Sequence, residues 1–241
     1  MVQYGGRNIR ASLACLVLMN KTSSICLYLQ MQNHLKYELY NVLSGKSAVR
    51  FGAIIQTIAG YLNDGEKTSP IVEDEKQNKK QETERLKDWI SKNKFWIEVD
   101  VSQYVSEGAE QKVYLKDSEN VLKLNDAIYY LSWKDYLYNL LLHNYFFPDT
   151  AYKLIGFTLI GEVLYAVVQQ SFVAITNTTD LIQVKRFLNQ NGFVNQRNND
   201  YFNPDLGIIL EDLHDENVLT KNDILYFIDT VFYLTDSFWK Q

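Results

Sequence analysis

Four polar residues near the end of the sequence have the types and spacing that phosphoryl transfer requires. Asp212, His214 and Asn217 share the run G-I-I-L-E-D-L-H-D-E-N-V-L, and Asp229 follows the apolar residues 224–228. In phosphotransferases an Asp of such a loop accepts the proton of the attacking hydroxyl, whereas an Asn and a second Asp hold Mg²⁺ on the phosphates of ATP. The spacing therefore predicts Asp212 as the catalytic base and Asn217 and Asp229 as metal ligands.

The same loop has a plainer interpretation, because Asp and Asn are common turn formers. Its agreement in order and spacing with upstream elements favours the phosphotransferase. We expect His214 to orient the loop by hydrogen bonding rather than to bind a metal. Asp215 and Glu216 are expected to face solvent.

Two upstream residues could contact the phosphates of a nucleotide. Gly108, in E-G-A-E-Q-K-V-Y, lies where a glycine would let backbone N–H groups approach phosphate oxygens, although an ordinary hairpin glycine is the alternative. Lys123 follows Val121 and Leu122, fifteen residues after Gly108, where a lysine would reach the α- and β-phosphates. A lysine pointing to solvent from the outer face of a strand is the alternative for Lys123.

Asp135 is the only acidic residue in the segment 127–144, which is predicted to be helical. At helical spacing it shares a face with Ile128 and Leu131. A carboxylate on an apolar face requires a partner, because burying an unpaired charge is costly. We therefore expect Asp135 to pair with Lys123 at the nucleotide site, where a kinase has Glu.

The elements that must position these residues are predicted to be helices before residue 95 and mainly strands after it. Before it, apolar residues recur at helical spacing. After it, short alternating runs predict strands, and a helix capped by Asn125 and Asp126 and ending near His143 interrupts them. The expected strands are 95–101, 113–115, 121–124, 152–157 and 163–169, with a turn at 160–162. This order is that of a kinase N-terminal lobe.

We therefore predict an α+β, protein-kinase-like fold of two lobes, with an antiparallel N-lobe sheet, one αC-like helix and a truncated C-lobe. The predicted regions are an N-terminal helical region at 1–94, the N-lobe at 95–173, and a minimal C-lobe with the catalytic and metal-binding loops at 174–241. The sequence ends twelve residues after Asp229, so we expect no activation segment. Either the N-terminal helices complete the C-lobe, or a partner supplies substrate binding.

Composition argues against other classes. The net charge is −5 and no basic block is present, so nucleic acid is not an expected partner. Cys15 and Cys26 are too few for a disulfide framework or a zinc cluster, which favours a cytoplasmic location. Arg7 and Arg10 precede the apolar residues 11–19, but this run is too short to span a bilayer and no cleavage pattern follows. We therefore expect neither a secretory signal nor a membrane partner.

Five segments, taken as a set, resemble the small bacterial kinase domain found in polyvalent proteins of phages and conjugative elements. They are E-G-A-E-Q-K-V-Y, V-L-K-L-N-D, L-L-L-H-N-Y-F-F-P-D-T-A-Y-K-L-I-G-F, D-L-H-D-E-N-V-L and F-I-D-T. The resemblance covers about residues 70–235. It implies a kinase-like fold and a Ser/Thr/Tyr kinase that uses ATP and Mg²⁺. By position it implies the same roles for Asp212, Asn217, Asp229 and Lys123. The loop is more similar to that of aminoglycoside-phosphotransferase-like kinases than to the H-R-D loop of eukaryotic protein kinases.

Departures from the family pattern keep a second function open. Asp229-Thr230-Val231 lacks the usual Phe and Gly after the metal-binding Asp, and Asp135 stands where Glu is usual. We expect an ATP/Mg²⁺-dependent kinase that transfers the γ-phosphoryl group to a hydroxyl, such as that of protein Ser, Thr or Tyr. The alternative is a pseudokinase that acts as a nucleotide-binding or protein-interaction module. The acceptor, whether a protein or a small molecule, is left open.

Overall fold

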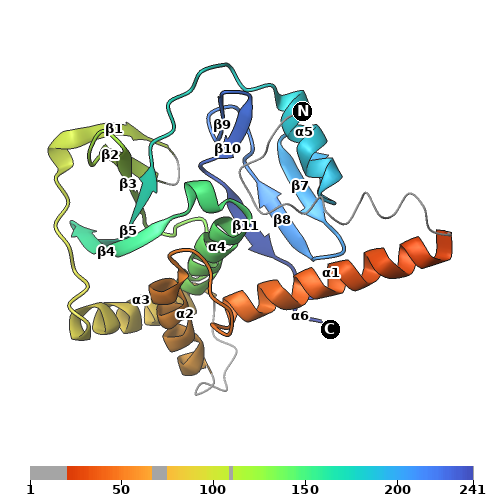
Figure 1. The fold of residues 1–241 in the computed structure, drawn as a ribbon. Coiled ribbons are helices and arrows are strands. Elements are labelled where there is room, and N and C mark those ends of the chain that lie inside the picture. Colours follow the sequence, from red (N-terminus) through yellow and green to blue (C-terminus); the bar gives the residue numbers. More distant parts are fainter. Residues whose placement is uncertain (1–20, 67–74, 109–110, 241) are drawn as a thin grey trace. The chain divides into compact units, whose positions relative to one another are not determined.

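The computed structural model describes residues 21–66, 75–108 and 111–240, and Figure 1 labels its helices and strands. The chain divides into two compact units: unit 1 comprises residues 1–41, 146–149 and 174–241, and unit 2 comprises residues 42–145 and 150–173. The predicted α+β class is confirmed. Helices form the N-terminal part, and an antiparallel five-stranded sheet and smaller antiparallel sheets follow.

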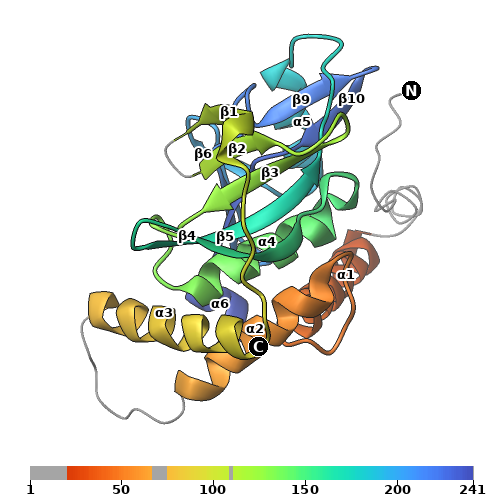
Figure 2. The same cartoon turned by 90° about the vertical axis from the view of Figure 1, so that its left-hand side faces the viewer.

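Unit 2 is built on the five-stranded sheet (Figure 2), in which all neighbouring strands are antiparallel. The strand order β1-β2-β3-β5-β4 places β3 in the middle. The strands are β1 (Tyr104–Glu107), β2 (Gln111–Leu115), β3 (Asn120–Asn125), β4 (Lys153–Ile160) and β5 (Val163–Ser171). The predicted hairpin at residues 152–169 is confirmed as β4–β5, and Gly161 at its turn has a φ of 61° that glycine adopts readily.

The strand predicted at residues 95–101 is wrong, although its alternation has a physical basis. This segment is extended and forms an isolated bridge to β4, in which the Ile97 N–H donates to the Phe157 carbonyl (2.9 Å). Ile97 and Val99 pack against the buried cluster of β2, β3 and β5. Ile97 and Val99 are therefore apolar because they cover one face of the sheet, not because they form a ladder.

Helix α4 (Trp133–Phe146) begins later than predicted. Asn125 and Asp126 cap turns rather than a helix, because their Oδ1 atoms accept hydrogen bonds from the backbone N–H groups of Ala127 (2.7 Å) and Ile128 (3.0 Å). Ala127 has a φ of 57°, which directs the chain away from a helix at this point. Ile128 and Leu131 precede the helix and are exposed, so the predicted helical face that joined them to Asp135 is wrong.

Unit 2 also contains the helices α2 (Gly52–Glu66) and α3 (Glu75–Lys92) (Figure 2), and α3 contributes a side chain that caps the N-terminus of α4. The Glu82 carboxylate of α3 accepts hydrogen bonds from the backbone N–H groups of Trp133 (2.6 Å) and Lys134 (3.1 Å). These groups have no partner within their own helix, so Glu82 acts as a helix cap supplied by another element. The Trp133 ring also contacts Phe157 of β4, with ring centroids 6.0 Å apart.

Among its described residues, unit 1 contains two small antiparallel sheets and α-helical segments. The four-stranded sheet has the order β11-β8-β7-β6, and the other is the β9–β10 hairpin. Its strands are β6 (Val194–Arg197), β7 (Asp200–Asn203), β8 (Ile208–Glu211), β9 (Val218–Lys221), β10 (Ile224–Phe227) and β11 (Val231–Leu234). Strands β6 and β7 form an antiparallel hairpin that ends at Asn203.

The helices of unit 1 are α5 (Leu181–Gln190), α6 (Asp236–Trp239) and the part of α1 (Lys21–Leu43) up to Asn41. Asp180 caps α5, as its side chain accepts a hydrogen bond from the Ile182 N–H (2.9 Å). Helix α1 is joined to the C-terminal residues, because the Lys36 ammonium donates to the carbonyls of Ser237 (2.6 Å) and Lys240 (2.9 Å). This N-terminal helix therefore packs with the C-terminal elements.

Some sequence-based expectations concern residues outside the described ones. They include Arg7, Arg10 and Cys15 of the N-terminal segment, and Ala109 and Glu110 of the loop after Gly108. In the part of the chain that the structure describes, no helix combines the length and the apolar character needed to cross a bilayer.

Candidate active site

The loop between β8 and β9 places Asp212 in an unusual backbone conformation. Asp212 has a φ of 65°, in the left-handed region that Asp tolerates better than most residues. Its N–H donates to the Asp200 carboxylate of β7 (3.2 Å), and its neighbour Leu213 is fully buried. The buried leucine and the Asp200 contact fix the loop, so that the 54 % exposed side chain of Asp212 projects from a rigid base.

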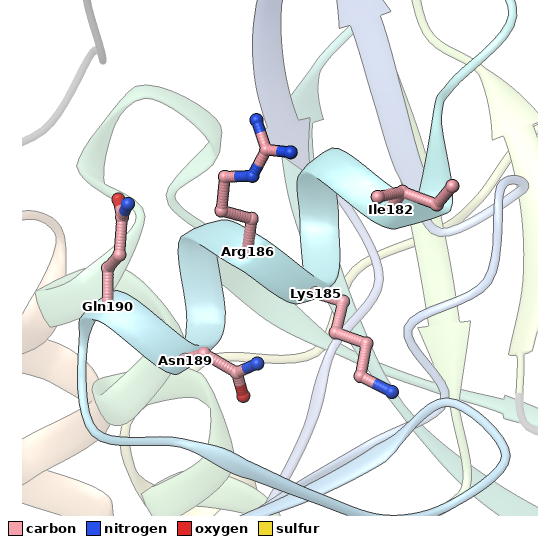
Figure 3. Close-up of a pocket in the computed structure, with 5 residues that line it drawn as sticks. All are labelled: Ile182, Lys185, Arg186, Asn189 and Gln190. Carbon is pink, nitrogen blue, oxygen red and sulfur yellow. The ribbon is translucent and has the colours of Figure 1, made fainter.

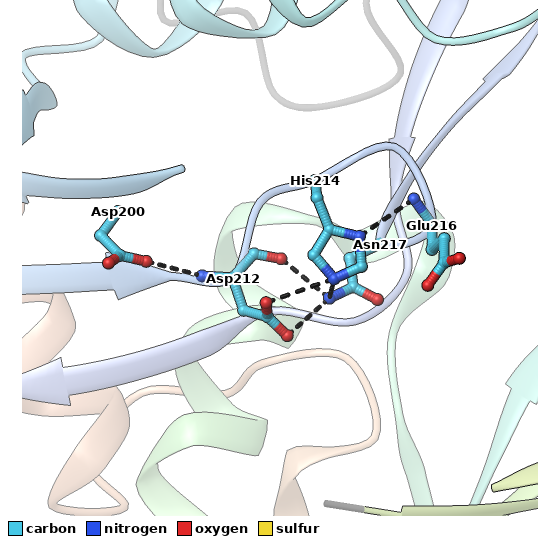
Figure 4. A network of polar contacts seen from close by, with 5 residues as sticks. All are labelled: Asp200, Asp212, His214, Glu216 and Asn217. Atoms are coloured by element: carbon cyan, nitrogen blue, oxygen red, sulfur yellow. Dashed lines mark hydrogen bonds and ion pairs between the residues drawn. The ribbon is translucent and has the colours of Figure 1, made fainter. Parts of the chain in front are cut away.

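A polar network surrounds the Asp212 carboxylate (Figure 4). The Asn217 amide nitrogen donates to the Asp212 carbonyl and to its Oδ2, both at 2.8 Å. His214 Nε2 lies 3.2 Å from Asp212 Oδ1. One carboxylate oxygen is thus held by Asn217 and the other by His214, which fixes the orientation of the carboxylate.

The proton position on His214 follows from its two neighbours. Its Nδ1 accepts a hydrogen bond from the Glu216 N–H (3.3 Å), so in the neutral imidazole the proton resides on Nε2, which also lies 3.1 Å from the Asn217 amide nitrogen. Nε2 faces Asp212 and therefore donates to the carboxylate. His214 orients the loop by hydrogen bonding, in the way that its spacing in the sequence indicates.

Asn217 also connects this loop to Asp229. The Asn217 carbonyl accepts hydrogen bonds from the N–H groups of Ile228 (2.9 Å) and Asp229 (3.4 Å), which follow β10. The β9–β10 hairpin returns the chain to this point, because β9 begins directly after Asn217 and β10 ends directly before Ile228. The structure therefore brings Asp212 and Asn217 of one loop into a cluster with the backbone of Asp229, which follows Asn217 by twelve residues, within unit 1.

The oxygen atoms of this cluster suit a hard divalent cation. The Asn217 nitrogen donates to Asp212, so the Oδ1 atom of the same amide takes no part in that contact, and an amide oxygen is of the ligand type that such a cation prefers. In the described residues, no three His, Cys, Asp or Glu side chains gather in the manner of a metal site. Two protein ligands are what Mg²⁺ takes when substrate phosphates complete its coordination.

Electrostatics near Asp212 also favour a cation. Burial raises the pKa of Glu211, and the negative charges of Asp200 and Asp212 raise it further. The end of β8 is therefore a region of negative potential. A bound divalent ion would offset the mutual repulsion of these carboxylates.

Lys123 lies in unit 2 on β3, the middle strand, and is only 4 % exposed. The register of β3, β5 and β4 places Lys123, Val168 and Phe157 on the same face of the sheet. Trp133 of α4 packs on Phe157, so this is the face that α4 covers. The solvent-facing alternative for Lys123 is therefore wrong.

The contacts of Asp135 lie at the start of α4. Its Oδ2 accepts a hydrogen bond from the Ser132 hydroxyl (2.7 Å), and its N–H donates back to the same hydroxyl (3.0 Å). The Ser132 hydroxyl thus caps the first turn of α4 by accepting from a backbone N–H, and it donates its own proton to the Asp135 carboxylate. The pairing of Asp135 with Lys123 stays a prediction, as do the roles assigned to the other site residues.

Gly108 ends the first strand of the sheet, and its N–H donates to the Gln111 carbonyl (3.0 Å). A Cβ atom added at Gly108 would meet no heavy atom within 4 Å, and its φ is not positive. Local geometry therefore gives no reason for a glycine at this position.

The exposed face of α5 carries a shallow pocket of about 430 Å³ (Figure 3). It is lined by Ile182, Lys185, Arg186, Asn189 and Gln190. Two cations and no carboxylate line it, so it is unsuited to Mg²⁺. None of the residues that line this pocket belongs to the cluster of Asp212, Asn217 and Asp229.

Sequence reasoning missed several residues that shape these sites. Asp200 stands in N-N-D, which predicts a turn, and its contact with Asp212 depends on the pairing of β7 with β8. Tyr152 lies 5.6 Å from the Lys123 ammonium, measured to the ring centroid, and precedes β4. No local pattern predicts either contact, since both contacts form between elements that are separate in sequence.

A family model described as a Serine/Threonine/Tyrosine kinase found in polyvalent proteins matches residues 79–236, which is about two thirds of the chain. No curated protein and no solved structure gives a significant match. The matched residues include Asp212, Asn217, Asp229 and Lys123.

Proposed function

Because the chain belongs to the Ser/Thr/Tyr kinases found in polyvalent proteins, we propose that it transfers the γ-phosphoryl group of ATP to a hydroxyl acceptor with the help of Mg²⁺. The observation that carries this proposal is the cluster in which Asn217 hydrogen-bonds the Asp212 carboxylate through its side chain and the Asp229 N–H through its carbonyl. It joins the base and both metal ligands that this reaction requires.

Asp212 is the proposed base. The acceptor oxygen forms a bond to the γ-phosphorus while the bond from that phosphorus to the bridging oxygen of ADP breaks. The hydroxyl proton passes to the Asp212 carboxylate. His214 and Asn217 hold one carboxylate oxygen each, so the base meets the acceptor in a fixed orientation.

Asn217 Oδ1 and the Asp229 carboxylate are the proposed ligands of Mg²⁺. When bound, this ion neutralises charge on the β- and γ-phosphates. The Asn217 nitrogen is held by Asp212, which directs the oxygen of the same amide away from the base. The base and the metal ligands are thereby kept as separate groups.

Lys123 and Gly108 are the proposed phosphate contacts from the sheet, with Asp135 as the acid of the adjacent helix. Lys123 is buried on the face that α4 covers. Gly108 occupies a position where a side chain would fit without a clash in the protein itself. In this proposal, the absence of a side chain at Gly108 lets a phosphate approach the backbone closely.

The alternative is a pseudokinase that binds nucleotide or a partner protein without transfer. One observation favours it, namely that the Asp135 carboxylate is engaged by Ser132. The cluster of Asp212, Asn217 and Asp229 favours the enzyme. Protein and small-molecule hydroxyls are both compatible acceptors.

Transfer of label from γ-³²P-ATP tests the proposal. Total transfer, including autophosphorylation, is measured with Mg²⁺ for the wild type, Asp212→Asn and Asp215→Asn. Asp212→Asn should lose at least about a hundredfold in rate, the usual contribution of a general base. Asp215 is exposed in the same loop, so its variant is the matched control and should retain wild-type transfer. Transfer that survives Asp212→Asn would refute the base, whereas ATP binding without transfer in the wild type would favour the pseudokinase.

A further inference from the structure

The Lys123 ammonium lies over the ring of Tyr152, a residue from outside its own strand. Lys123 is 4 % exposed, and a buried ammonium requires compensating contacts. The Tyr152 ring is 3 % exposed and lies with its centroid 5.6 Å from Lys123 Nζ. At this distance the negative face of an aromatic ring attracts a cation, and it does so more strongly when water is excluded.

Tyr152 is itself held by α4. The Asn144 side chain accepts a hydrogen bond from the Tyr152 N–H (2.7 Å) and donates one to the Tyr152 carbonyl (2.8 Å). The ring of His143, the preceding residue of α4, lies with its centroid 4.3 Å from that of Tyr152. Two consecutive residues of α4 therefore fix the backbone and the ring of Tyr152.

His143 is buried and neutral. Its Nε2 lies 3.0 Å from the Thr150 carbonyl, which can only accept, so Nε2 carries the proton. The Gln170 amide donates to the same carbonyl (2.7 Å). Burial lowers the pKa of His143 to about 3, and the nearby charge of Lys123 contributes to this lowering. His143 thus packs beside Tyr152 without adding a positive charge next to Lys123.

We propose that Tyr152, fixed by His143 and Asn144 of α4, positions the Lys123 ammonium for the phosphates of ATP. The proposal rests on the function proposed above, in which Lys123 contacts the nucleotide. Helix α4 is thereby coupled to Lys123 through the C-terminal half of the helix. Asp135, by contrast, lies at the N-terminal end, where it contacts Ser132.

A double-mutant cycle tests this coupling. ATP affinity in Mg²⁺ is measured for the wild type, Tyr152→Leu, Lys123→Met and the double variant. Tyr152→Leu should weaken ATP affinity about tenfold, as expected for the loss of a desolvated cation–π contact. In the Lys123→Met background the same change should have no further effect. An equal loss of ATP affinity in both backgrounds would overturn the proposal, because Tyr152 would then affect ATP binding only by stabilising the fold.

Two variants separate the ring from its hydroxyl and from general packing. Tyr152→Phe keeps the ring and should bind ATP as the wild type does. Tyr114→Leu removes a 5 % exposed tyrosine that packs with Leu124 and Val167 on the other face of the sheet. It should lower thermal stability without a change in ATP affinity. A Tyr114→Leu variant as weak for ATP as Tyr152→Leu would overturn the proposal.

A readout without nucleotide distinguishes failure of this proposal from failure of the proposed function. The ε-CH₂ proton resonance of Lys123, assigned by its loss in Lys123→Met, should be shifted upfield by the ring current of Tyr152. The shift should persist in Tyr152→Phe and disappear in Tyr152→Leu. Its absence from the wild type would overturn the positioning role whether or not ATP binds. Wild-type protein that shows the shift but binds no ATP would overturn the proposed function, and the positioning role with it.

Discussion

Among single residues, Gly108 is a glycine without a local structural cause, as is the exposed Gly60 of α2. We predict that Gly108→Ala changes the free energy of unfolding by less than about 0.5 kcal/mol, since the added methyl meets no neighbouring atom. ATP affinity should nevertheless fall, because the methyl would stand where a phosphate approaches. Denaturant titration and calorimetric ATP titration measure the two effects.

Gly161 supplies the matched control in the same sheet. Its φ of 61° disfavours alanine, so Gly161→Ala should destabilise the protein by about 1 kcal/mol and leave ATP affinity unchanged. If Gly108→Ala bound ATP as tightly as the wild type, Gly108 would be an ordinary hairpin residue.

His143 should make the protein sensitive to acid. Its pKa is lowered from 6.5 to about 3 in the fold, so below pH 6.5 the unfolded chain binds a proton that the folded chain does not. The stability that this group provides is therefore complete above pH 6.5 and is lost as the pH falls toward 3. The loss approaches about 1 kcal/mol per pH unit for a group so fully buried.

The variant His143→Gln keeps an amide donor for the Thr150 carbonyl but cannot titrate. Denaturant unfolding between pH 7 and pH 4.5 should show a smaller decline in stability for this variant than for the wild type. Carboxylates contribute to both proteins alike, so the difference isolates His143. Parallel declines would contradict the assignment of a neutral, buried His143.

At the scale of elements, the contact between α3 and the N-terminus of α4 depends on the carboxylate of Glu82. Glu82 accepts hydrogen bonds from the N–H groups of Trp133 and Lys134, and it is 9 % exposed. Glu82→Ala would leave both donors buried without an acceptor. We predict a loss of about 1–3 kcal/mol in the free energy of unfolding, measured by denaturant titration.

Glu84, on the same helix, is the control for Glu82. It is exposed and pairs with Lys87 at 2.9 Å, an interaction that contributes little in water. Glu84→Ala should therefore cost no more than about 0.5 kcal/mol. Equal losses for the two variants would mean that Glu82 does not cap α4 in solution.

Some helices and strands could be predicted from the sequence and others could not, depending on whether neighbouring residues alone determine them. The α3 helix and the β4–β5 hairpin could be predicted because their periodicity and turn residues are contiguous. The start of α4 could not, because the side chains of Asn125 and Asp126 bond to backbone groups two residues on and form turns that compete with a helix. In segment 95–101, apolar and polar residues alternate because Ile97 and Val99 pack on the sheet. Periodicity alone cannot distinguish such burial from strand pairing.

At the scale of the whole molecule, the contacts of the candidate residues are of two kinds: those within one loop and its hairpin, and those between elements that are far apart in sequence. Asp212, His214 and Asn217 could be predicted because one short loop holds them, and Asp229 because a hairpin returns to that loop. The contact of Tyr152 with Lys123 could not be predicted, since it depends on how α4 and β4 pack around β3. The regions predicted at 1–94, 95–173 and 174–241, and the meeting of Lys123 with Asp229 around one nucleotide, stay predictions.

The thermal unfolding midpoint in the presence of ATP and Mg²⁺ tests the central claim most directly, since nucleotide binding must precede transfer. A ligand present at about a hundred times its Kd stabilises a protein by about 2.7 kcal/mol, which raises Tm by roughly 5–10 °C for a chain of this size. We predict such a rise for the wild type and for Lys185→Ala, a surface control on α5. Asp229→Ala, or EDTA in place of Mg²⁺, should abolish it. A wild-type Tm unchanged by millimolar ATP and Mg²⁺, or a rise of equal size in Asp229→Ala, would contradict the account.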